Sequence, residues 1–134
     1  MKYICLGYLE PGTFENMSEG ERNTLLDECF SYNDELRKNG HLVAEERLQP
    51  PNTAVTICLK NRRVAVSDGP YTETKEHLGG IQVLDARDLN HAIQLISQHP
   101  AVKWKWGTVE IRPAADLNET MRESERRRRE DASR

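Results

Sequence analysis

Residues 67–80 read SDGPYTETKEHLGG and connect two strand-like runs of the chain. Gly69 and Pro70 favour a turn, because proline fixes its own φ angle and pushes the preceding residue out of the helical region. The carboxylate of Asp68 can accept hydrogen bonds from backbone groups ahead of it and hold that turn. The closing pair of glycines lets backbone approach backbone, or a ligand, closely. The stretch is therefore either a well-capped connection or a polar loop that contributes to a site.

A strand–helix–strand unit lies on each side of this connection, at about residues 2–48 and 80–112. Residues 2–9 are apolar on both alternating faces, which is typical of a central strand whose two faces are covered. A second strand is expected at about 41–48. The final strand, 107–112, alternates clearly, with its valine and isoleucine predicted to face inward.

Each unit carries one predicted helix. Ser18 and Glu21 form a capping-box pattern at the start of the first helix, and Asn39-Gly40 ends it. Asp88 is the expected cap of the second helix. The apolar residues recur at helical spacing and are predicted to face inward. In the first helix they are Leu25, Leu26, Cys29, Phe30, Tyr32 and Leu36, and in the second Leu89, Ala92, Ile93 and Ile96.

A β-hairpin is predicted between the two units, from residues 53–59 and 63–66 with a turn at 60–62. The order of elements predicts an α+β fold of the ferredoxin-like, split βαβ type, with an inserted hairpin and an antiparallel sheet that carries two helices on one face. The other face of the sheet needs cover, because strand 2–9 is apolar on both sides. A second copy of the chain, packed sheet against sheet, would supply it, so we expect a homodimer.

The composition limits the partners. The 134 residues fit one domain, and the net charge of −3 gives no general attraction to nucleic acid or to an anionic membrane. Apolar runs are too short for a membrane span, and Met1 leads into a strand pattern, so we expect a cytoplasmic protein. Residues 114–134 have balanced charges and only a weak apolar pair, which predicts a helical or disordered tail after a domain at 1–113.

Three segments carry a resemblance to a known family: residues 68–80, the Glu46-x-Leu48-x-Pro50 segment, and VEIRP at 109–113. Over about residues 1–113 the chain resembles the DGPF-type subgroup of the YCII-related family, with Tyr71 in place of the phenylalanine that gives the subgroup its name. The resemblance implies a ferredoxin-like chain that pairs into a dimeric α+β barrel. Members of the family are often encoded beside, or fused to, extracytoplasmic-function sigma factors.

The resemblance implies little about activity. The wider family is suspected of using a histidine–aspartate pair in the first helix and the turn after it. The corresponding places here hold Cys29 and Lys38, so that mechanism is not carried over. The remaining ligand-binding candidates are polar residues of the loop and of the strands near it, with Asp68 and Glu76 as acid–base candidates and Lys75 as an anion holder. The full set is Tyr8, Glu46, Asp68, Glu73, Lys75 and Glu76.

Other reactive residues give no site. The three cysteines are scattered, lack C-x-x-C spacing and are expected to be buried free thiols. The four histidines have no metal-binding spacing and are expected at the surface or at strand ends, so no metal and no cofactor is predicted. Trp104 and Trp106 are expected to pack on the rim of the barrel rather than to stack on bases.

Two functions remain open. The chain could bind a small molecule in a cleft lined by the motif loop, with acid–base chemistry by its carboxylates, in which case it could be an enzyme. Alternatively, it could be a non-catalytic regulatory or interaction module associated with sigma-factor systems. An apolar pocket with convergent polar side chains would favour the first function. A barrel interior without a pocket would favour the second.

Overall fold

The computed structural model describes residues 1–104 and 107–134. Its elements follow in this order: β1 (Lys2–Leu9), α1 (Glu19–Lys38), β2 (Leu42–Arg47), the 3-10 turn η1 (Pro51–Thr53), β3 (Val55–Lys60), β4 (Arg63–Asp68), β5 (His77–Asp85), α2 (Leu89–Ser97), α3 (Pro100–Lys103), β6 (Thr108–Pro113) and α4 (Asn118–Ala132).

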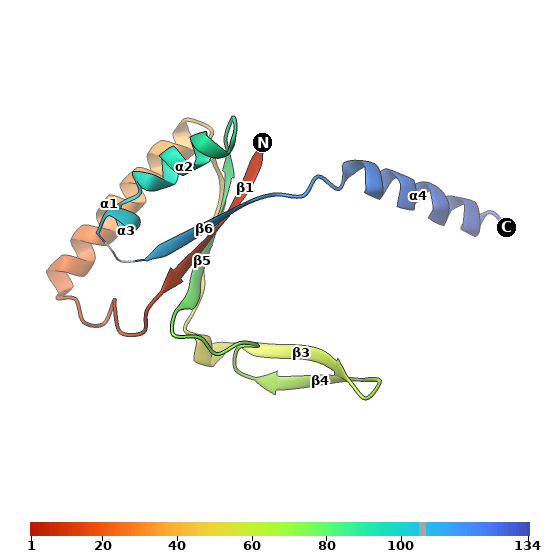
Figure 1. Ribbon diagram of the computed structural model, residues 1–134, viewed down its shortest axis with the longest axis horizontal. Coiled ribbons are helices and arrows are strands. Elements are labelled where there is room, and N and C mark those ends of the chain that lie inside the picture. The colour runs from red at the N-terminus through yellow and green to blue at the C-terminus, as the bar shows by residue number, and fades with distance from the viewer. Residues whose placement is uncertain (105–106) are drawn as a thin grey trace.

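Four strands form the main sheet in the order β2-β5-β1-β6, and every neighbouring pair is antiparallel. Helices α1, α2 and α3 lie on one face of this sheet (Figure 1). The prediction of a ferredoxin-like α+β chain is therefore confirmed. Strand β1 takes the central place that its two apolar faces predicted.

Helix α1 begins and ends as its sequence predicts. The Ser18 hydroxyl accepts the Glu21 backbone N–H at 3.1 Å, and the Glu21 side chain returns to the Ser18 N–H, which completes the capping box. At the other end Gly40 has a φ of 80°, a left-handed conformation that glycine adopts without strain. Local chemistry thus sets both ends of the helix.

The inward face of α2 differs from the prediction. Ala92 and Ile96 are buried, but Leu89 and Ile93 are each 44% exposed. The helix buries His91 instead, next to Ala92 in the chain. On α1, Phe30 is likewise exposed, whereas Leu25, Cys29 and Leu36 are buried as expected.

The sheet divides its side chains between two faces. Tyr3 and Cys5 of β1 point to the helices and are buried in the core with Leu36, Leu84 and other apolar residues. Ile4 and Leu6 alternate to the helix-free face, where they lie opposite Val83 and Ile81 of β5. These four partly exposed side chains, the outer patch, form a square at the centre of the sheet.

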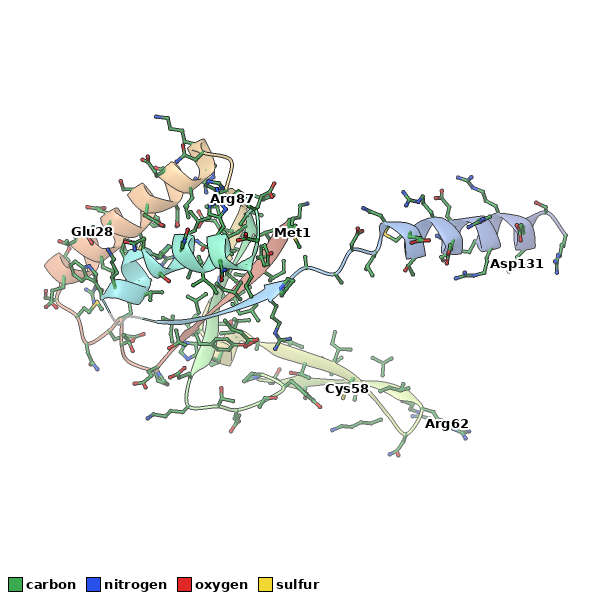
Figure 2. The ribbon with its side chains drawn as sticks, turned by 45° about the horizontal axis from the view of Figure 1, so that its top comes forward. Met1, Glu28, Cys58, Arg62, Arg87 and Asp131 are labelled. Carbon is green, nitrogen blue, oxygen red and sulfur yellow. The ribbon has the colours of Figure 1, made fainter. Side chains whose placement is uncertain are left out.

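Strands β3 and β4 form a separate two-stranded sheet that projects from the body (Figure 2). Asn61 and Arg62 turn the chain with φ angles of 49° and 66°. The register places five apolar side chains on one face of this hairpin. This hairpin face is exposed and consists of Val55, Ile57, Leu59, Val64 and Val66.

Helix α4 contains no buried residue and stands away from the sheet (Figure 1). None of the described helices is both long and apolar enough to cross a membrane. The structure thus has the predicted tail as a helix, while the division into a domain and a tail stays a prediction.

Candidate functional site

A cavity of about 420 Å³ lies between the sheet and the helices. Gly7 shares the helix-facing side of β1 with Cys5, because side chains alternate along a strand. Gly7 lies opposite Gly80 of β5 in the sheet register. A Cβ atom at Gly7 would meet only the Gly80 carbonyl oxygen, at 3.6 Å. Two facing glycines therefore leave space where the core would otherwise hold side chains.

The lining of this cavity combines apolar and polar groups. Leu9 and Val109 come from the sheet, Ile96 from α2, and Phe14 from the segment before α1. The register between β1 and β5 shifts after Gly7, so the strands depart from regular pairing beside the cavity. Most of the exposed lining surface is apolar. A few polar side chains interrupt it, as in sites where such groups orient a ligand.

A polar network joins four of the lining residues. Asn33 of α1 donates from Nδ2 to Oε2 of Glu45 at 3.0 Å, and its Oδ1 lies 3.0 Å from Nε2 of His99. Nε2 of Gln82 donates to Asn33 Oδ1 at 3.2 Å and to Glu45 Oε2 at 3.3 Å. Arg37, outside the cavity, donates to the other oxygen of Glu45 at 2.8 Å. Residues from α1, β2, β5 and the loop before α3 thus meet at one place.

The network fixes the tautomer of His99. The Ala101 backbone N–H donates to Nδ1 of His99 at 3.2 Å, so Nδ1 is an acceptor without a proton. In the neutral ring the proton is then on Nε2, which donates it to Asn33 Oδ1. Both ring nitrogens are therefore used within the protein. His99 holds the network in place and is not a free base.

Burial lowers the pKa of His99 below its usual value; the nearby Arg47 cation acts in the same direction and Glu45 opposes it. As the pH falls below about 6.5, the unfolded chain gains a proton at this ring before the folded chain does. The stability that neutral His99 contributes is therefore lost as the pH falls through the unfolded value towards the lower folded one.

We expect this effect to be visible in a pH series. Thermal melts at about pH 7.5 and about pH 5.5 should show a larger fall in Tm for the wild type than for His99→Gln, whose amide is neutral at both pH values. Equal falls in the two proteins would show that His99 does not titrate against folding.

Two residues with exchangeable protons, Tyr8 and His77, are among those that line the cavity. His77 begins β5 opposite Leu9, on the helix-facing side, whereas Tyr8 follows Gly7 in β1 and shares the helix-free face with Ile4 and Leu6. Neither side chain has a hydrogen-bond partner among the described residues. Arg47 also lines the cavity, and its guanidinium lies 5.5 Å from the centre of the Phe30 ring, within the range of a cation–π contact.

The sequence candidates are separated in the structure. Tyr8 is the one of the six that lines the cavity, among the residues that the structure describes. Glu46 lies opposite Ile81 on the helix-free face of the sheet. The other four lie at the end of β4 or in the loop after it: Asp68, Glu73, Lys75 and Glu76. The Lys75 ammonium is 4.0 Å from the carboxylate of Glu10, and both side chains are largely exposed.

The turn at residues 68–70 is held differently from the prediction. No hydrogen bond of the Asp68 carboxylate is found among the described residues. Instead, the Gly69 N–H donates to the Ala54 carbonyl at 2.8 Å, and the Thr56 hydroxyl donates to the Gly69 carbonyl at 2.7 Å. Gly69 has a φ of 96°, which explains the glycine at this position. One backbone hydrogen bond and the Thr56 hydroxyl, not the aspartate, hold the turn.

The histidine prediction was wrong for two residues. His91 and His99 are each 8% exposed, because α2 and the loop after it bring them into the core. His41 lies beside Asp85, at the opposite end of β5 from His77, so those two histidines do not meet. Within residues 1–104 and 107–134 no group of histidine, cysteine and carboxylate side chains could hold a metal ion.

The cysteines are free, and burial follows the prediction for two of them. Cys5 and Cys29 are buried, while Cys58 on the hairpin is half-buried. Cys5 lines the cavity, but burial raises the pKa of its thiol to about 11. A thiol protonated at neutral pH is a poor nucleophile, so Cys5 shapes the cavity without supplying reactivity.

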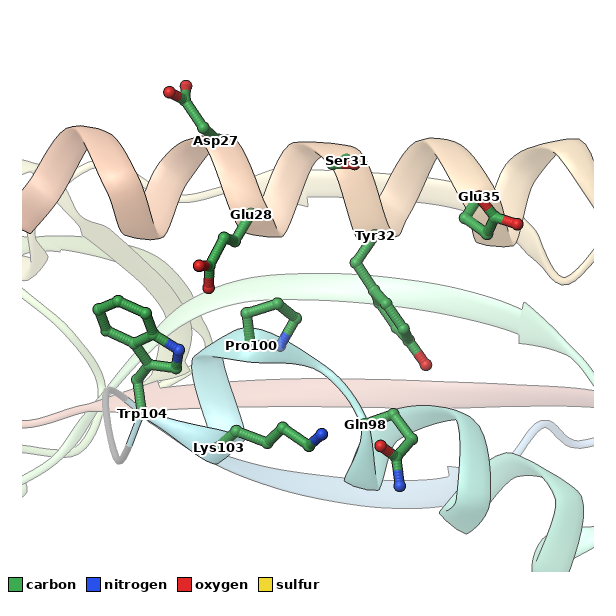
Figure 3. A pocket seen from close by; sticks show the side chains of 9 residues that line it. All are labelled: Asp27, Glu28, Ser31, Tyr32, Glu35, Gln98, Pro100, Lys103 and Trp104. Atoms are coloured by element: carbon green, nitrogen blue, oxygen red, sulfur yellow. The ribbon is translucent and has the colours of Figure 1, made fainter.

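A second hollow of about 650 Å³ lies between α1 and α3 and is open to solvent (Figure 3). Its carboxylates are exposed, and the Tyr32 hydroxyl donates to the Leu95 carbonyl at 2.5 Å. Trp104 lines this hollow, and its place on a barrel rim stays a prediction; Trp106 lies outside the described residues. Without enclosure or a polar network, this hollow is a weaker candidate than the cavity.

The comparisons with known proteins agree with this fold. The chain is 27% identical over 115 residues to the uncharacterized protein R00369 of Rhizobium meliloti (strain 1021), a match that covers 86% of this chain and 93% of that protein. It also resembles the structure of 5-chloro-2-hydroxyhydroquinone dehydrochlorinase from Burkholderia phenoliruptrix AC1100, in complex with 2,5-dihydroxybenzoquinone. The TM-score is 0.53 at 12% identity, with 86% of this chain and 94% of that chain covered. Residues 1–118 match the YCII-related domain, and the chain therefore belongs to the YCII-related family.

Proposed function

We propose that this protein binds a small organic molecule in the cavity above Gly7 and Gly80. The observation that carries the proposal is the cavity itself. Small-molecule sites are clefts or cavities of roughly 300–1,000 Å³. This cavity, of about 420 Å³, falls in that range. An apolar lining with a few fixed polar groups suits a compact, largely apolar ligand with polar substituents.

The chemistry proposed for the site is proton transfer by His77. An imidazole can accept or donate a proton. His77 lines the cavity, lies opposite Leu9 in the sheet register and has no partner among the described residues, so it is available to a ligand. The dehydrochlorinase with the same fold was solved with 2,5-dihydroxybenzoquinone, which supports an oxygen-bearing ring as the type of ligand.

The motif at residues 68–80 is part of the proposal. We assign the chain to the DGPF-type subgroup on this motif, and its last residues, among them His77, Gly79 and Gly80, line the cavity. A cleft lined by the acidic part of the motif, with Asp68 and Glu76 as acid and base, stays a prediction. A cytoplasmic location also stays a prediction from the sequence.

We further propose that the chain is a homodimer. The outer patch of Ile4, Leu6, Ile81 and Val83 lies at the centre of a sheet face that no described helix covers. Charged side chains of β2 and β6, including Glu46 and Glu110, flank it, as in the polar rim of an interface. The exposed hairpin face adds a second apolar surface, and an isolated two-stranded hairpin is only marginally stable in water.

The interaction-module function is the second candidate, and the hairpin favours it. Five exposed apolar side chains on one strand pair are more than a monomeric surface usually carries in one place. A partner protein from a sigma-factor system would bury the hairpin face in place of a second copy of this chain. The interaction-module function is favoured if the cavity binds no small molecule and the protein is monomeric.

The experiment for the cavity is a titration of ¹⁵N-labelled protein with 2-naphthol, an oxygen-bearing ring probe. We expect shifts at the backbone N–H groups of Gly7, Gly80 and Ala101, which surround the cavity, and none at the helix α4, which serves as the internal control. Shifts confined to the loop 69–76 would place the site at the motif instead. No shift at any described residue would contradict the proposed function.

A further inference from the structure

The side-chain amide of Gln82 is held in one orientation. Its Nε2 lies 3.2 Å from Asn33 Oδ1 and 3.3 Å from Glu45 Oε2. Both of these atoms are acceptors, so the nitrogen of Gln82, and not the oxygen, must face them. A single amide nitrogen has two hydrogens, and the two contacts use both. The amide of Gln82 therefore has no spare donor.

The groups at the two ends of the network support this assignment independently. At one end the Ala101 backbone N–H can only donate, which places the ring proton of His99 on Nε2 and requires an oxygen at Asn33 Oδ1. At the other end the Glu45 carboxylate, paired with a guanidinium at 2.8 Å, requires donors from its neighbours. Reversing either amide would bring two donors or two acceptors together and leave buried polar groups unpaired, which is unfavourable.

One atom of this network is left over. Oε1 of Gln82 has no hydrogen-bond partner among the described residues, and Gln82 lines the cavity. A carbonyl oxygen in a largely apolar, half-buried place is an acceptor that lacks a donor. The network thus presents the cavity with an acceptor in a fixed position and prevents the amide from turning to offer a donor.

We infer that Gln82 determines the ligand class of the cavity: it selects neutral molecules that carry a hydroxyl or amino donor and disfavours analogues in which that donor is blocked. This inference rests on the proposed function, because it assigns the specificity of the same cavity. A site built to accept a hydrogen bond loses binding free energy when its acceptor stays unpaired and away from water. The difference in affinity should be at least about fivefold.

The test compares 2-naphthol with 2-methoxynaphthalene, which has the same rings and a methyl group in place of the hydroxyl hydrogen. Dissociation constants are measured by calorimetry for the wild type, for Gln82→Met and for Gln94→Met. Methionine keeps the length of the side chain and removes the acceptor. Asn33 Oδ1 and Glu45 keep their other donors in this variant, which protects the fold. Gln94 is exposed on α2 and lies outside the cavity lining, so it is the matched control.

We expect the wild type and Gln94→Met to prefer 2-naphthol at least about fivefold, and Gln82→Met to bind the two probes with a ratio close to one. If the wild type binds 2-naphthol and 2-methoxynaphthalene with equal affinity, the inference is wrong. It is also wrong if the ratio of the two affinities in Gln82→Met equals that in the wild type. If the wild type binds neither probe, the proposed function fails, and this inference fails with it. If it binds both equally, the cavity is a binding site and only the role of Gln82 is wrong.

Discussion

Replacing both Ile57 and Val66 by lysine is expected to dissociate the proposed dimer, with a rise of at least about 100-fold in its dissociation constant. These residues lie directly opposite each other in the middle of the hairpin face and are 67% and 65% exposed in the single chain. A partner that packs on this face would bury both. Two lysines would then place unpaired charges in an apolar contact, which is strongly unfavourable. Light scattering across a concentration series measures the change.

The matched control places two lysines on the other face of the same hairpin, at Ala65 and Ser67. These residues pair with Cys58 and Thr56, so they point away from the hairpin face. The added charge is the same, and the control should remain a dimer. The homodimer proposal would be contradicted by a wild type that is monomeric near 15.4 kDa at micromolar concentration. If the dimer persists with lysines at Ile57 and Val66 but dissociates with lysines at Ala65 and Ser67, the opposite face of the hairpin, and not the hairpin face, forms the contact.

The fold could be predicted where local chemistry decides the structure. The capping box at Ser18 and the glycine at residue 40 define α1 without help from distant residues. The apolar residues on both faces of the segment 2–9 likewise identified the central strand. The separation of the hairpin from the main sheet could not be predicted. The alternation of Val55, Ile57 and Leu59 is the same whether those side chains meet the chain's own core or another surface.

The candidate site was less accessible to sequence reasoning. Helical spacing could have predicted that Asn33 is buried, because it lies four residues after Cys29 and three before Leu36, on the buried stripe of α1. A polar residue at that place indicates a buried hydrogen-bond network. Its partners could not be identified, since Glu45, Gln82 and His99 are 12, 49 and 66 residues away and meet it only in the folded chain. The motif directed attention to its acidic residues, whereas its final glycines form the cavity.

The cavity itself can be closed by one substitution, Gly7→Val. Valine suits a strand, and its Cβ would make an ordinary contact of 3.6 Å with the Gly80 carbonyl oxygen, so the backbone need not move. Its two methyl groups would project into the cavity. Since glycine in a strand costs about 0.5–1 kcal/mol, the variant should be as stable as the wild type or more so. Its affinity for 2-naphthol should nevertheless fall at least about tenfold.

Gly20→Val is the matched control for this substitution. Gly20 is exposed on α1 and lies outside the cavity lining. Apart from its chain neighbours and the backbone of its own helix, no described atom lies within 4 Å of the place that a Cβ would take there. The control should bind 2-naphthol as the wild type does. A thermal melt of each variant shows first that it is folded.

The measurement that tests the central claim most directly is the calorimetric titration of 2-naphthol into folded Gly7→Val beside the wild type. We predict a measurable affinity in the wild type and an affinity at least about tenfold weaker, or no binding, in the variant with unchanged or raised Tm. Binding of equal strength to both proteins would contradict the claim that the space above Gly7 and Gly80 is the binding site.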